Sequence, residues 1–113
     1  MAYGIENPNS VDLVTVKPED RMIKLIIVGP ERWSGTTEER DSLKKKLESY
    51  VVFVEGGQLL NTYPQAKGFS VHFQIDTPVA LPAPLQTWIQ EIAAVLGADH
   101  GIDLQVLLVD AAV

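Results

Sequence analysis

The sequence predicts an α+β fold, a two-layer sandwich in which two helices cover one face of a mixed four-stranded sheet. Two apolar stripes at helical spacing and one strand with strict period-two alternation are the observations behind this prediction. The predicted order is ββαβαβ. Strands separated by a helix can lie parallel, whereas consecutive strands pair antiparallel, so we expect a mixed sheet. A length of 113 residues suits a single domain, 1–113, whose residues 1–10 form a leading segment of turn formers.

The first half of the chain is predicted to hold a β-hairpin and a helix. Residues 11–17 and the β-branched residues 22–28 form the two strands, joined by a turn that begins at a proline. Thr36 and Glu39 have the spacing of a capping box, so a helix should begin there and end at Gly56 and Gly57. Its apolar stripe consists of Leu43, Leu47, Tyr50, Val51 and Val54.

The second half supplies two more strands and the second helix. Residues 58–68 form a connection with room for one short helical turn, and residues 69–76 alternate between apolar and polar side chains. The prolines at 82 and 84 have the fixed φ favoured in a first helical turn, and Gly97 should end that helix. Residues 102–109 are the last strand. The second apolar stripe consists of Leu85, Trp88, Ile89, Ile92, Ala93 and Leu96.

Composition excludes several classes of partner. Fifteen acidic and nine basic residues give a net charge of −6, which repels nucleic-acid backbones. We interpret the run Lys44-Lys45-Lys46 as a solvated helix face, with carboxylates four residues away. No apolar run approaches the roughly 20 residues that span a bilayer, and the start lacks the pattern of a signal peptide. We therefore expect a cytoplasmic protein with no nucleic-acid or membrane partner.

The loop at residues 29–37 is the first candidate binding site. Its two glycines loosely resemble a phosphate-binding loop, but five residues separate them instead of four, and Thr36 stands where that motif has lysine. A weak anion site at the helix start, helped by Arg32, remains an alternative. Trp33 lies beside Arg32, and both residue types are enriched at binding hot spots. The other explanation is a tryptophan folded over the edge of the core.

The second candidate site consists of His72, Gln74 and Asp76, which a spacing of two places on one side of a strand. A metal site needs three or four ligands, and the other histidine, His100, lies in a predicted turn. Acid/base catalysis lacks a nucleophile here. Polar residues on an open sheet face are the alternative explanation. We assign no catalytic residue, metal ligand or cofactor, and an enzyme is disfavoured.

The last strand differs from the third because it carries apolar residues on both faces. One face receives Ile102, Leu104, Val106 and Leu108. Leu107 and Val109 lie on the other. Such a strand is buried on both sides, or half-buried against another subunit. Since two helices cover one sheet face, we infer self-association or partner binding through the open face, unless loops and the leading segment cover it.

Three stretches of the sequence carry a resemblance to a known family. They are Asn7-Pro8 followed by Val11-Asp12, the stretch LESYVVFVEGG at residues 47–57, and the stretch YPQAKG at residues 63–68. Through these stretches the sequence resembles a family of small bacterial proteins known only as a domain of unknown function, and the resemblance extends over most of the chain. No activity is attached to that family. The resemblance therefore implies the fold and a bacterial cytosol.

These observations leave two functional hypotheses. The first is a non-catalytic protein-binding domain, a homodimer or the partner of another protein, that uses its open sheet face. The second is a small-molecule-binding protein or weak enzyme that uses His72, Gln74 and Asp76, or the Trp33 loop. A closed pocket lined by those side chains would favour the second, and a flat apolar sheet face of more than a few hundred Å² would favour the first.

Overall fold

The computed structural model describes residues 11–109, which form one mixed four-stranded sheet and three α-helices. The predicted leading segment, residues 1–10, lies outside this range. The strands are β1 (Leu13–Lys17), β2 (Met22–Val28), β3 (Ser70–Thr77) and β4 (Asp103–Leu108). The helices are α1 (Thr37–Glu55), α2 (Gln58–Thr62) and α3 (Ala83–His100), with 3-10 turns at Pro18–Asp20 and Pro64–Ala66. The predicted α+β class and the mixed four-stranded sheet are confirmed.

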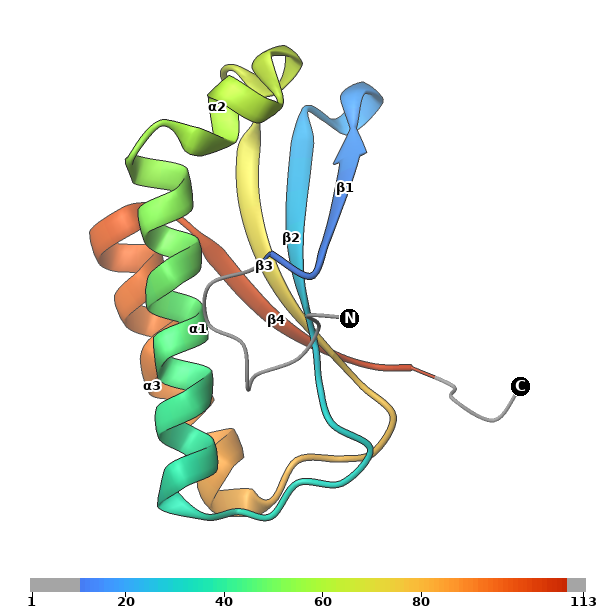
Figure 1. Cartoon of the computed structure of the whole chain (residues 1–113), viewed down its shortest axis with the longest axis vertical. Helices are drawn as coiled ribbons and strands as arrows, with labels where there is room; N and C mark the ends of the chain where they lie inside the picture. The colour runs from blue at the N-terminus through green and yellow to red at the C-terminus, as the bar shows by residue number, and fades with distance from the viewer. Residues whose placement is uncertain (1–10, 110–113) are drawn as a thin grey trace.

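The strands lie in the sheet in the same order as along the chain, β1-β2-β3-β4. β1 and β2 are antiparallel, while β2, β3 and β4 run parallel to one another. Figure 1 shows α1 and α3 running along the same side of the sheet, with α2 near one end. This order makes β1 and β4 the two edges of the sheet. Lys24, His72 and Asp103 form one row across three strands.

The core lies between the sheet and the two long helices. Alternate residues of the two central strands are fully buried on this side, namely Ile23, Leu25, Ile27, Phe73 and Ile75. Tyr50 of α1 meets the Phe73 ring edge-on, with the ring centroids 5.6 Å apart. From the predicted helical stripes, Leu43, Leu47, Tyr50, Leu85, Ile89 and Leu96 are buried here. The period-two and helical patterns therefore identified the core-facing sides correctly.

The ends of the helices follow the glycines and the caps, with two differences from the prediction. The hydroxyl of Thr36 accepts from the Glu39 amide at 3.2 Å, but the Glu39 carboxylate accepts from the amides of Ser34 and Gly35 instead of that of Thr36. α3 continues past Gly97 and ends at Gly101, whose φ of 64° is left-handed. A glycine inside a helix costs only about 1 kcal/mol, so the helix continues to the glycine that supplies the left-handed cap.

The interpretation of Lys44, Lys45 and Lys46 as one solvated helix face is wrong for Lys46, whose side chain is fully buried. Its ammonium lies 2.7 Å from the buried carboxylate of Asp12. Lys46 is three residues after Leu43 and four before Tyr50, so it lies on the apolar stripe of α1. That spacing was visible in the sequence. The sequence did not show that the Asp12 carboxylate lies next to Lys46, where it makes burial of the ammonium tolerable.

Candidate functional site

A buried polar cluster joins the residue before β1 to β2 and α1. One oxygen of the Asp12 carboxylate accepts from Lys46, and the other accepts from the amide of Val28 at 3.0 Å. The hydroxyl of Tyr50 accepts from the Asp12 amide at 3.0 Å and donates to the carbonyl of Ile26 at 2.9 Å. Burial raises the pKa of Tyr50 well above its usual range, the hydrogen bond from the Asp12 amide lowers it in part, and the Asp12 charge raises it. The cluster holds three chain segments together.

The open face of the sheet is turned away from α1 and α3. It carries a first series of polar contacts, centred on Gln74. Lys24 on β2 donates to the side-chain oxygen of Gln74 at 3.3 Å, and the amide nitrogen of Gln74 donates to Asp76 at 2.7 Å. Gln74 is only 7% exposed. Two of the predicted site residues, Gln74 and Asp76, are therefore in contact, and the side-chain oxygen of Gln74 is bound by Lys24.

His72 belongs to a second series of polar contacts, which the sequence pattern did not predict. Its Nε2 lies 3.3 Å from the hydroxyl of Ser70, and its Nδ1 lies 3.3 Å from the carboxylate of Asp103 on β4. Gln105 donates to the same oxygen of Asp103 at 2.8 Å. The spacing of Ser70 and His72 was visible in the sequence. Asp103 could not be added, because it meets His72 only through the β3–β4 pairing.

Trp33 lies against the edge of the core. Its indole nitrogen donates to the hydroxyl of the buried Thr77 at 2.9 Å, and its ring packs on the core residues. A Cβ at Gly29 would lie 2.9 Å from this ring and 2.8 Å from the carbonyl oxygen of Asp76, so glycine permits the close approach. Arg32 is exposed. Just before the start of α1 the Glu39 carboxylate accepts from the amides of Ser34 and Gly35, so an anion in this loop would lie beside a negative charge.

β4 exposes apolar side chains at its C-terminal half. The exposed fractions are 39% for Val106, 47% for Leu107 and 63% for Leu108. Val109 is half-buried, and its amide donates to the carbonyl of Thr77 at 2.8 Å. The predicted site residue Leu107 therefore lies where the open face meets the edge of the sheet. We call the side of β4 that does not pair with β3 the β4 edge.

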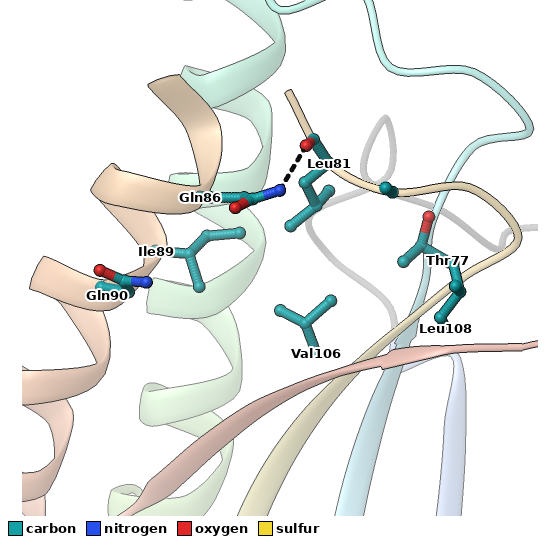
Figure 2. Close-up of a pocket in the computed structure, with 8 residues that line it drawn as sticks. Thr77, Leu81, Gln86, Ile89, Gln90, Val106 and Leu108 are labelled. Carbon is teal, nitrogen blue, oxygen red and sulfur yellow. Dashed lines mark hydrogen bonds between the residues drawn. The ribbon is translucent and has the colours of Figure 1, made fainter. Parts of the chain in front are cut away.

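A groove of about 300 Å³ runs beside this edge on the helix side of the sheet. Figure 2 shows Val106 between the β4 ribbon and Ile89 of α3, and Gln86 donating to the carbonyl of Leu81, at 2.7 Å. The lining residues are Thr77, Ala80, Leu81, Gln86, Ile89, Gln90, Val106 and Leu108. His72, Gln74 and Asp76 do not line this groove. Its lining is apolar or uncharged, so the groove offers no charged side chain to an occupant.

Comparison with known proteins gives a family and no activity. A family model described as a family of unknown function (DUF6572) matches residues 3–110, which include every strand and helix described above. No curated protein and no solved structure matches the chain. Within residues 11–109, no helix has both the length and the apolar character needed to cross a membrane.

Proposed function

The chain belongs to this family of unknown function, and we propose that it is a non-catalytic protein-binding domain that self-associates in the bacterial cytoplasm. The observation that carries the proposal is the run of exposed apolar side chains at Val106, Leu107 and Leu108. Exposed apolar clusters at a sheet edge are typical of sites that contact another chain. The proposal takes α1 and α3 as one layer on one side of the sheet, which leaves the open face and the β4 edge for the contact.

On the open face, the composition favours a contact centred on Leu107 over a contact that covers the whole face. Much of its β3 section is polar, and Gln74 already binds both Lys24 and Asp76. Leu107 lies next to Asp76 in the sheet, at the margin of that polar section. Burying Leu107 and its apolar neighbours removes hydrocarbon from water, at about 25 cal/mol per Å². We therefore place the centre of the contact at β4.

Light scattering over a range of concentrations tests the proposal. We expect a mass approaching twice 12.4 kDa as the concentration rises. Leu107→Lys should weaken the dimer by about tenfold or more, because a charge would be placed in an apolar contact. Leu13→Lys is the matched control, since Leu13 is 42% exposed on the opposite edge strand and should leave the dimer unchanged. A monomer at every concentration would overturn the proposal, as would equal effects of the two substitutions.

A weak hydrolytic enzyme is the second candidate, favoured by the contacts of His72 alone. Ser70, His72 and Asp103 lie in the hydrogen-bonding order of nucleophile, base and orienting carboxylate. In this reading the Ser70 hydroxyl, which also lies 3.3 Å from the carbonyl of Arg21 as a donor, turns its proton to His72. His72 takes that proton while the Ser70 oxygen attacks an ester carbonyl. His72 then passes that proton to the departing alkoxide, and water releases the acyl group from the serine.

An activated ester, p-nitrophenyl acetate, tests this second candidate. We expect an acetyl group on Ser70, detected by mass spectrometry, and its loss in Ser70→Ala and in His72→Gln. Ser49→Ala is the control, because Ser49 lies on α1 and should not affect acylation. If wild-type protein carries no acetyl group, or carries it equally in Ser70→Ala, the hydrolytic candidate is rejected.

A further inference from the structure

The backbone of β4 directs a set of hydrogen-bonding groups along its outer edge, away from β3. The amide of Val109 donates to Thr77, so the odd-numbered residues of β4 direct their amides and carbonyls toward β3. Successive residues of a strand direct these groups to opposite sides. Leu104, Val106 and Leu108 therefore direct theirs outward. Within residues 11–109, no strand pairs with that side of β4.

We infer that two copies of the chain pair antiparallel along the β4 edge, with a twofold axis at Val106, and join their four-stranded sheets into one of eight strands. This inference rests on the proposed self-association and specifies its partner, edge and register. It differs from stacking of two open faces, because main-chain hydrogen bonds between the two copies provide the contact. Antiparallel pairing about a twofold axis uses the same surface of both copies.

The register follows from which residues direct their backbone outward. Directly opposite residues of an antiparallel pair lie on the same face of the sheet. With the axis at Val106, each Leu104 lies opposite Leu108 of the partner subunit, and both belong to the helix side of the sheet. Asp103 then lies opposite Val109 of the partner subunit, so no two like charges are opposed. This register brings all three outward-directed residues of β4 into the ladder, whereas a shift in either direction leaves some of them unmatched.

Charge favours this edge over the rest of the surface. A chain with a net charge of −6 repels its own copy, but residues 104–109 contain no charged side chain. The neighbouring groove is lined on α3 by Gln86, Ile89 and Gln90, none of which is charged. The opposite edge strand, β1, is shorter and ends in Lys17, and an edge lysine opposes pairing. A second copy approaching along residues 104–109 therefore meets apolar and neutral groups, and Asp103, at the start of β4, is the one charged residue of that strand.

The twofold axis also extends the groove beside β4. An axis perpendicular to the sheet keeps the helices of both copies on the same side, so each α3 lies near the junction. Val106 and Leu108, which line the groove, would then contact the apolar β4 residues of the partner. Stable dimers bury about 800 Å² per subunit, and a six-residue strand edge supplies only part of that area. We therefore expect a dissociation constant in the range of about 1–100 µM.

Single cysteines test the register, because the natural chain contains none. Val106→Cys places two cysteines opposite each other with Cα atoms about 5.5 Å apart, within the range that a disulfide spans. We expect Val106→Cys to form a covalent dimer under mild oxidation, at a concentration that populates the dimer, and a reductant to reverse it. Leu108→Cys is the matched control. Leu108 is more exposed than Val106, yet its copies lie about 13 Å apart in this register, so cross-linking should be at least tenfold slower.

A second variant tests the hydrogen bonds and does not depend on cysteine chemistry. Val106→Pro removes an amide that the β3–β4 ladder does not use, and proline is tolerated where the N–H of an edge strand faces outward. We expect a folded monomer by circular dichroism and light scattering. A dimer that persists in Val106→Pro, or equal cross-linking at positions 106 and 108, would overturn the edge register while leaving self-association intact. A wild-type protein that stays monomeric would overturn both proposals.

Discussion

Replacing Lys46 by alanine should lower the free energy of unfolding by about 3–5 kcal/mol, because it removes one member of a fully buried ion pair. The Asp12 carboxylate would lose the ammonium that lies 2.7 Å away and would remain in the core. Urea unfolding monitored by circular dichroism gives the difference. Lys45→Ala is the matched control, since Lys45 is exposed on the same helix and should change stability by no more than about 0.5 kcal/mol.

The double variant Asp12→Asn with Lys46→Met distinguishes two contributions to stability: the attraction between the two charges and the cost of removing both charges from water. Removing both charges avoids leaving one of them buried, so the double variant should be more stable than Lys46→Ala. Equal stability of Lys46→Ala and Lys45→Ala would contradict the buried position of Lys46. That outcome would restore the interpretation of the three lysines as one solvated face.

Tyr50→Phe should cost about 1–3 kcal/mol, because the buried amide of Asp12 loses the hydroxyl that accepts its hydrogen bond. The carbonyl of Ile26 also loses the Tyr50 hydroxyl, but Ile26 is paired with neighbouring strands on both sides. The ring itself is retained, so its edge-on contact with Phe73 is unchanged. Urea unfolding at pH 7 measures the loss. A cost below about 0.5 kcal/mol would contradict the two hydrogen bonds.

The pH dependence of stability gives a second measurement on the same hydroxyl. The pKa of Tyr50 in the folded protein is raised above the unfolded value of about 10, chiefly by burial. The folded state therefore keeps a proton that the unfolded state releases, and this contribution is constant below pH 10 and falls above it. The slope should approach about 1.4 kcal/mol per pH unit, and Tyr50→Phe should remove it. Tyr63→Phe, a control at a partly exposed tyrosine, should retain it.

Local patterns were sufficient to predict most of the fold. The alternation in β3 and the helical spacing of Leu43, Leu47 and Tyr50 record which side of each element meets the core. A capping threonine and two glycines identified the limits of α1. These signals are local because a strand or helix exposes each face at a fixed period. The predicted end of α3 at Gly97 is wrong because the glycine with left-handed backbone that caps the helix is Gly101, and the residue type alone does not show that conformation.

The contacts at the candidate sites were harder to predict because they join distant parts of the chain. Asp12, just before β1, contacts Lys46 of α1. His72 contacts Asp103 through the pairing of β3 with β4. The sequence shows each residue type and its face, but not which strand is its neighbour. Trp33 shows the same limit, since its hydrogen bond to Thr77 depends on the loop returning to the end of β3. The proposed contact of Leu107 with a second copy stays a prediction.

The agreement between strand order in the sheet and strand order along the chain has a consequence for synthesis of the protein. Each new strand joins the edge that the previous one provides, so no strand must be inserted between two already paired. The order of synthesis therefore matches the order of neighbours in the sheet, so that each strand leaves the ribosome after the neighbour with which it pairs. β4 is the last strand to join, and its outer backbone is then the surface to which a further strand would be added.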